Sequence, residues 1–85
     1  MTIRTFKDAT AIITGAATGI GKALAVELSN RGCTVVLTDR QVALAETVAA
    51  EIVSHGGNAW ARELDVCDYE LMQTIVDETV AKTGR

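Results

Sequence analysis

Apolar positions along the chain follow two spacings that alternate from one end to the other. Short continuous apolar runs, which are typical of strands buried on both faces, occur at residues 9–14 (ATAIIT), 33–38 (CTVVLT) and 58–64 (NAWAREL). The third run contains Arg62 and Glu63, so we expect this strand at an edge of the sheet, where charged side chains are tolerated.

Between and after these runs, apolar residues recur at the spacing of a helix face. The first helix is expected to begin at Gly19 and to stop before Gly32, and the second to stop at Gly56. Asp68 is the expected N-terminal cap of the third helix. The predicted buried faces are Ile20, Ala23, Leu24, Glu27 and Leu28 in the first helix, Val42, Ala45, Val48, Ala49, Ile52 and Val53 in the second, and Tyr69, Met72, Ile75, Val76, Thr79 and Val80 in the third.

This alternation of strands and helices predicts a single α/β domain. Strands joined by helices form parallel sheets with right-handed crossovers, so the expected order is β-α-β-α-β-α around a three-stranded parallel sheet. A chain of 85 residues, 48% of them apolar, has the length for one small domain with a modest core. The expected architecture is a half-sized doubly wound fold over residues 1–85.

A glycine-rich segment, TGAATGIG at residues 14–21, connects the first expected strand to the first expected helix. A helix N-terminus in this position presents free N–H groups and the positive end of the helix dipole, which favour an anion such as a phosphate. Gly15 would let the chain turn off the strand, Gly19 would let a pyrophosphate approach the backbone, and Gly21 would let the helix pack close to the sheet. These are the roles of glycines in a dinucleotide-binding Rossmann fold.

The glycine segment has two other interpretations. A triphosphate-binding P-loop requires G-x-x-x-x-G-K-[ST], but Ala16 replaces its first glycine and Ala23 its hydroxyl residue. A tight connection without a ligand is the other alternative. A dinucleotide site also requires a preceding strand, a following helix and an acidic residue about 20 positions further on. Asp39, at the end of the second expected strand, meets the last requirement.

Asp39 also bears on the choice of cofactor. A carboxylate at this strand end can accept hydrogen bonds from both ribose hydroxyls of an adenosine and repels a 2′-phosphate. Arg40 beside it could receive that phosphate, whereas Thr18 in the glycine loop adds no positive charge. The sequence therefore favours NAD, with NADP as the alternative. A structural role, in which Asp39 starts a turn or caps the next helix, is the other interpretation of this residue.

Composition and charge exclude several classes of partner. A net charge of -3, spread along the chain, argues against nucleic acid and against an anionic membrane surface. No apolar run has the length of a membrane span and the first residues do not resemble a signal peptide, so we expect a cytoplasmic protein. The spacing of Cys33 and Cys67 suggests neither a disulfide nor a metal site, and we expect both side chains to be buried.

Two segments together resemble a known family. Thr14-Gly15-x-x-x-Gly19-x-Gly21 is similar to the glycine pattern of the short-chain dehydrogenases/reductases, and LDVCD at residues 64–68 is similar to the Asp-Val segment of that family. The resemblance covers nearly the whole chain and implies a Rossmann fold that binds NAD(P).

The resemblance also implies roles for individual residues. Gly15, Gly19 and Ile20 would lie along the pyrophosphate and Asp39 on the adenosine ribose, while Asp65 and Val66 would line the adenine pocket. With the residues argued above, the predicted cofactor-binding set is Gly15, Thr18, Gly19, Ile20, Gly21, Asp39, Arg40, Asp65 and Val66.

The catalytic residues of that family do not occur in this chain. The family continues into a fourth strand ending in Asn-Ala-Gly, and then to a Ser and a Tyr-x-x-x-Lys that carry the proton transfer. Tyr69, the only tyrosine, has Gln73 where the lysine would stand, and we expect it to pack in the core. His55, near a helix C-terminus, is expected to be a favourable charge at that end or a surface residue rather than a catalytic base. No catalytic residue is predicted.

The leading hypothesis is therefore the N-terminal, adenosine-binding half of a short-chain dehydrogenase/reductase, truncated before the fourth strand. The parent enzyme would transfer a hydride between a nicotinamide cofactor and an alcohol or carbonyl compound. One side of the first strand would lack a neighbour, which favours self-association through that edge. The alternatives are a non-catalytic adenine-nucleotide-binding module and an interaction module that pairs through the open sheet edge.

Overall fold

Strands and helices alternate strictly in the computed structural model, which describes residues 9–65 and 67–83. The elements are β1 (Thr10–Thr14), α1 (Gly19–Asn30), β2 (Thr34–Asp39), α2 (Val42–Ser54), β3 (Asn58–Glu63) and α3 (Tyr69–Thr83). The strands form one parallel sheet in the order β1-β2-β3. The predicted β-α-β-α-β-α order and parallel sheet are confirmed, and so is the edge position of β3.

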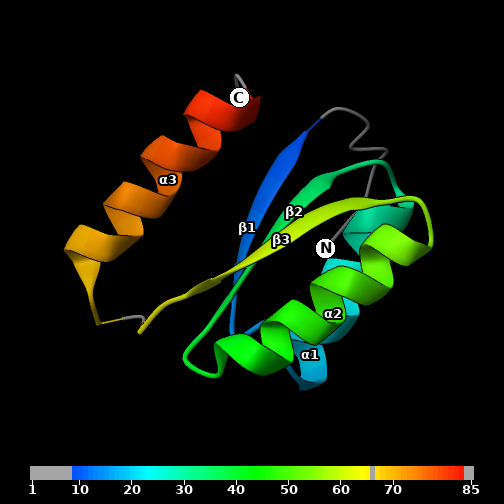
Figure 1. Cartoon of the computed structure of the whole chain (residues 1–85), viewed down its shortest axis with the longest axis horizontal. Coiled ribbons are helices and arrows are strands. Elements are labelled where there is room, and N and C mark those ends of the chain that lie inside the picture. The colour runs from blue at the N-terminus through cyan, green and yellow to red at the C-terminus, as the bar shows by residue number, and fades with distance from the viewer. Residues whose placement is uncertain (1–8, 66, 84–85) are drawn as a thin grey trace.

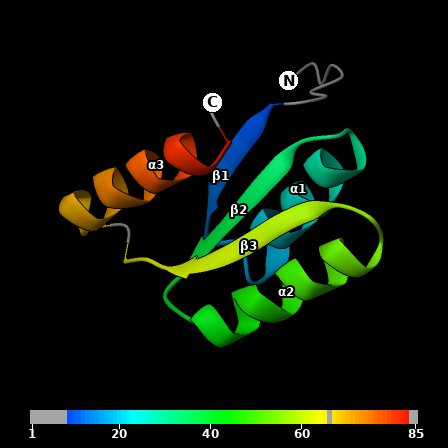
Figure 2. The ribbon, with the colours of Figure 1, turned by 45° about the horizontal axis from the view of Figure 1, so that its top comes forward.

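The sheet lies between two helical layers. Helices α1 and α2 cover one face and α3 covers the other, as both views show (Figure 1, Figure 2). The two crossovers step in the same direction along the sheet, from β1 to β2 and from β2 to β3, so a common hand places their helices on one face. Consequently, the strands bury apolar side chains on both faces.

Residues in register across the strands divide between two hydrophobic cores. Ile12, Val36 and Trp60 are paired across the sheet and face α3, where they pack with Leu64 and Ile75. Neighbouring strand positions face α1 and α2, because successive side chains of a strand point to opposite faces. This second core includes Ile13, Val35, Leu37, Ala45, Val48, Ala49 and Ile52.

The predicted buried face of α1 is wrong in part, because a glycine sets the rotation of the helix. A Cβ atom built on Gly21 would lie 2.1 Å from the carbonyl oxygen of Gly15, so this side of α1 must face the glycine loop. Ala25, four residues further on, shares that side and is fully buried. Ile20 turns away from it and is 88% exposed, and Ala23 is exposed as well.

Helix α2 follows its predicted face more closely. Ala45, Val48, Ala49 and Ile52 are buried against the sheet. Val53 is an exception, because it lies at the border of this face and is half exposed.

Helix α3 begins where the sequence predicts but buries a narrower stripe. The Asp68 side chain accepts a hydrogen bond from the backbone N–H of Leu71 at 3.0 Å, which confirms Asp68 as the cap. Ile75 is buried, whereas Tyr69 is largely exposed, so the predicted packing role of the tyrosine is wrong. Tyr69 and the half-exposed Val80 lie about 120–140° around the helix from Ile75, outside the stripe that meets the sheet.

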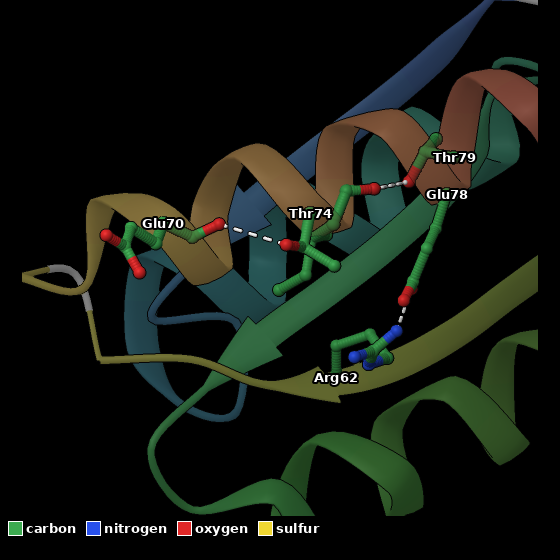
Figure 3. A network of polar contacts seen from close by, with 6 residues as sticks. Arg62, Glu70, Thr74, Glu78 and Thr79 are labelled. Carbon is green, nitrogen blue, oxygen red and sulfur yellow. Dashed lines mark hydrogen bonds and ion pairs between the residues drawn. The ribbon is translucent and has the colours of Figure 1, made fainter.

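Contacts between side chains tie α3 to the edge strand β3. Arg62 of β3 points toward Glu78 of α3 and forms an ion pair with it (Figure 3). Two residues nearer the start of β3, the ring of Trp60 lies beneath a cation of α3. The ammonium of Lys82 is 4.2 Å from the centre of this ring. Arg62, one of the two charged residues predicted to be tolerated at an edge strand, therefore also anchors the neighbouring helix.

The two cysteines lie in different environments. Cys33 is buried at the start of β2, and burial raises the pKa of its thiol. Cys67 is exposed in the turn before α3, so the prediction that both side chains are buried is wrong for this residue.

Candidate functional site

The predicted site residues gather where the three strands end, at the carboxyl-terminal edge of the sheet, which we call the loop edge. Parallel strands end at the same edge, and each strand contributes one segment there (Figure 1). The glycine loop follows β1, Asp39 ends β2 with Arg40 next to it, and Asp65 lies two residues beyond β3. Val66, which was predicted with Asp65, lies outside the described residues. In open α/β sheets this edge is where ligands bind.

Two glycines give the loop after β1 its shape. Gly15 has a φ angle of +62° and Gly19 one of +59°, which is the left-handed region that favours glycine. Apart from the glycine itself, its two chain neighbours and the adjacent backbone of α1, no described atom lies within 4 Å of the position that a Cβ would take at either residue. Backbone conformation rather than crowding therefore requires these glycines, and the space beside the loop backbone is open.

Gly21 has a different role from the other two glycines. Its missing Cβ would clash with the Gly15 carbonyl oxygen at 2.1 Å and lie 3.1 Å from the Ala16 Cα. The sequence predicted close packing of α1 on the sheet, but the close contact is with the loop itself. Gly21 thus lets α1 begin directly against the turn that leaves β1.

The end of β2 holds the glycine loop through backbone and side-chain contacts. The Ala16 N–H donates to the Thr38 carbonyl oxygen at 3.1 Å, and the Thr38 hydroxyl donates to the Ile13 carbonyl oxygen at 2.8 Å. Ala16 is fully buried and Ala17 is 6% exposed, so the loop is packed rather than merely tethered. Thr38, Ala16 and Ala17 could not be identified as site residues from the sequence, because their contacts depend on strand register. The small size of Ala16 and Ala17, which follow Gly15, was the one signal for the two alanines.

Asp39 connects the loop to the start of α2. Its Oδ2 accepts a hydrogen bond from the Ala17 N–H at 3.2 Å, and its Oδ1 accepts one from the Gln41 N–H at 2.9 Å. The carboxylate therefore has the turn-forming role that was the structural alternative for this residue. A carboxylate has about four acceptor positions, so two remain for hydroxyl donors of a ligand.

Asp39 and its neighbours line an open hollow at this edge of the sheet. The hollow has a volume of ≈ 530 Å³ and is lined by Gly15, Asp39, Arg40, Gln41 and Leu64. It brings together residues from the ends of all three strands.

Arg40 and Asp65 lie at the exposed side of the same edge. The Arg40 Nε is 3.9 Å from the Asp65 Oδ2, and both side chains are at least half exposed. Asp65 also accepts a hydrogen bond from the Cys67 N–H through its Oδ1 at 2.9 Å, which is a turn contact.

The N-terminus of α1 opens beside the loop. Thr18, the residue before the helix, has an extended backbone, and its side chain makes no capping hydrogen bond. The first turn of α1 contains no acidic residue. Its backbone N–H groups and the helix dipole therefore favour an anion at this position, next to the exposed Ile20.

The one histidine of the chain lies away from this site. His55 follows α2 at the opposite edge of the sheet, and its Nδ1 is 2.8 Å from the Glu51 carbonyl oxygen. Because a carbonyl only accepts, that ring nitrogen must carry a proton.

Within residues 9–65 and 67–83, no group of three or more His, Cys, Asp or Glu side chains could hold a metal ion. In the same ranges, no helix combines the length and apolarity needed to cross a membrane.

A glycine loop between the first strand and the first helix, at the carboxyl ends of a parallel sheet, is the feature that defines proteins with a dinucleotide-binding fold. The short chain dehydrogenase family model matches residues 9–85. The chain belongs to the family of short-chain dehydrogenases/reductases. This confirms the resemblance that was stated from the glycine and Asp-Val segments.

Comparisons with individual proteins agree with this family. The chain is 38% identical over 79 residues to cyclohexanol dehydrogenase of Acinetobacter sp., covering 93% of this chain and 32% of the relative. It is 36% identical over 75 residues to 7alpha-hydroxysteroid dehydrogenase of Escherichia coli, covering 88% of this chain and 29% of the relative. The chain thus spans about a third of the length of the curated relatives it matches.

Solved structures show the same fold. A metagenomic short-chain oxidoreductase in complex with NADP superimposes with a TM-score of 0.88 at 34% identity, covering 96% of this chain and 37% of that one. A hydroxysteroid dehydrogenase from Escherichia coli gives a TM-score of 0.89 at 34% identity, covering 94% of this chain and 34% of that one.

Proposed function

We propose that the loop edge of the sheet binds the adenosine diphosphate half of a nicotinamide dinucleotide. The observation that carries the proposal is the glycine loop, which leaves open space beside its backbone, leads into the uncapped N-terminus of α1 and is bonded to Asp39. Membership of the family and the solved relative in complex with NADP support this class of cofactor.

The residues of this edge fit the separate parts of such a cofactor. The loop at Gly15 and Gly19, with Ile20 and the open helix end, suits a pyrophosphate because phosphates are held by backbone N–H groups. Thr18 and Gly21 shape this part without adding charge. The acceptor positions left on Asp39 suit the ribose hydroxyls. By family resemblance, Asp65 and Val66 would border the adenine.

The whole protein would be an oxidoreductase that acts on an alcohol or carbonyl group. A bound nicotinamide dinucleotide supplies the hydride chemistry. The residues of this chain would bind and orient the cofactor, and we propose residues 1–85 as the N-terminal half of the dinucleotide-binding domain. Since the Ser and the Tyr-x-x-x-Lys of the family do not occur among the 85 residues, the chain by itself is not expected to catalyse. We also propose a cytoplasmic location.

NAD is the proposed cofactor, with NADP as the weaker alternative. Asp39 lines the hollow with its carboxylate held in place by two backbone N–H groups, so it would lie near a ribose and repel a 2′-phosphate. Arg40 is the one positively charged side chain lining the hollow, and it could attract that phosphate.

Calorimetric titration of the 85-residue chain with NAD, NADP and AMP tests the proposal. We expect NAD and AMP to bind, NAD to bind more tightly than NADP, and Asp39→Asn to weaken NAD at least about tenfold, since it removes a charged acceptor. Asp77→Asn is the matched control, because Asp77 is exposed on α3 and its carboxylate accepts a hydrogen bond from the Gln73 side chain. A folded chain that binds none of the three nucleotides would contradict the proposal.

A further inference from the structure

Three charged side chains border the hollow or its exposed side, and they are not equivalent. Asp39 has both carboxylate oxygens bonded to backbone N–H groups, at Ala17 and Gln41. Arg40 is largely exposed and reaches Asp65 instead, with 3.9 Å between its Nε and the Asp65 Oδ2. The arginine is therefore paired across the strand ends with the segment after β3, not with its neighbour in sequence.

This pairing has a direct consequence for binding of a 2′-phosphate on the adenosine ribose, the group that distinguishes NADP from NAD. A 2′-phosphate would find one positively charged donor here, the Arg40 guanidinium, because the two other charged side chains are carboxylates. Asp65 competes for that guanidinium and adds a second negative charge at the same edge. A ribose 2′-hydroxyl carries no charge and would be affected by neither effect.

We propose that Asp65 is a specificity-determining residue that acts through Arg40. By holding the guanidinium across the strand ends, it lowers the affinity of this edge for a 2′-phosphorylated adenosine, and hence for NADP relative to NAD. The proposal rests on the nucleotide site proposed above and assigns Asp65 a role besides bordering the adenine.

The expected effect is modest, because the pair is exposed. Ion pairs of this kind contribute little, so neutralising Asp65 should raise the affinity for the 2′-phosphate by about threefold relative to the unphosphorylated nucleotide. The gain should shrink as salt is added, since exposed charges are screened.

Binding of two adenosine probes to the full chain tests this role. Calorimetric titrations use adenosine 5′-monophosphate and adenosine 2′,5′-bisphosphate with the wild type, Asp65→Asn, Arg40→Gln and the double variant. Asparagine keeps an oxygen that can accept the Cys67 N–H, so the turn before α3 is retained. Glu51→Gln is the control, because it removes the same charge from the last turn of α2, at the opposite edge of the sheet.

The ratio of the two affinities decides the outcome. When Arg40 is present, we expect Asp65→Asn to raise the affinity for the bisphosphate relative to the monophosphate. In the chain that also carries Arg40→Gln, the same change should raise this ratio much less. The gain should disappear at high salt. Glu51→Gln should leave the ratio unchanged. An equal gain with and without Arg40, or no gain in a chain that binds the monophosphate, would overturn the role of Asp65. Binding of neither probe by the folded wild type would overturn the nucleotide site itself.

Discussion

At the scale of single residues, the three glycines of the loop are required for two different reasons. Gly15 and Gly19 have left-handed backbone conformations in open space, whereas Gly21 has an ordinary helical position but no room for a side chain. A ligand-binding loop and a tight start of α1 are thus built from the same short segment. The spacing of these glycines predicted the loop, but the partner of Gly21 required the structure.

Gly21→Ala should destabilise the fold even though alanine is the better helix former. The new Cβ would lie 2.1 Å from the Gly15 carbonyl oxygen, so the loop or the helix must move. Overpacking costs about 1–3 kcal/mol, and over most of that range it exceeds the gain of about 1 kcal/mol in helix propensity, so we expect a net loss in the free energy of unfolding. Urea denaturation followed by circular dichroism measures it. Ala23→Gly, at an exposed position of the same helix, calibrates the propensity term, and an unchanged or raised stability of Gly21→Ala would contradict the packing described here.

At the scale of elements, the sequence predicted where helices and strands begin more accurately than it predicted which sides they bury. The cap of α3 at Asp68 could be predicted from the sequence, because it depends only on the next three residues. The exposure of Tyr69 could not be predicted. The apolar pattern gives the helical period, but the contact with the sheet decides how wide a stripe of the helix is buried. Ile20 of α1 was misassigned for a similar reason, since Gly21 and not the apolar pattern sets the rotation of that helix.

Ile75 and Tyr69 offer a direct test of how α3 packs. Ile75 is 1% exposed beneath α3, and Tyr69 is 80% exposed on the same helix. We expect Ile75→Ala to lower the free energy of unfolding by about 2–5 kcal/mol, because it leaves a cavity. Tyr69→Ala should change it by less than about 0.5 kcal/mol. Chemical denaturation of both variants measures the difference, and comparable losses would show that α3 packs with another face.

At the scale of the whole molecule, β1 has a paired side and an open side. In the described part of the chain it pairs with β2 alone, and β2 is buried on both faces while β1 is only partly buried. Unpaired N–H and C=O groups along a strand edge are a template for another strand. The parallel fold could be predicted from the alternating pattern, but the contacts of Thr38 and Asp39 with β1 and the glycine loop could not, because they join residues 22 and 25 positions apart.

Self-association through the β1 edge is the proposed consequence for the isolated chain. We expect sedimentation velocity to show a monomer at low protein concentration and a dimer as the concentration rises, since edge pairing is a bimolecular reaction. A folded chain that stays monomeric at all concentrations would contradict this proposal and leave the nucleotide site unaffected.

Amide chemical shifts would locate, residue by residue, a dinucleotide bound at the loop edge of the sheet. Titration of the isotope-labelled chain with NAD should move the backbone signals of Gly15, Gly19 and Ile20, together with that of Asp39. The signals of Gly56 and Gly57, at the opposite edge, should stay in place and serve as the internal control. Saturating shifts confined to the loop edge are the predicted result. A folded chain with no shifts, or with shifts only at the opposite edge, would contradict dinucleotide binding at the loop edge.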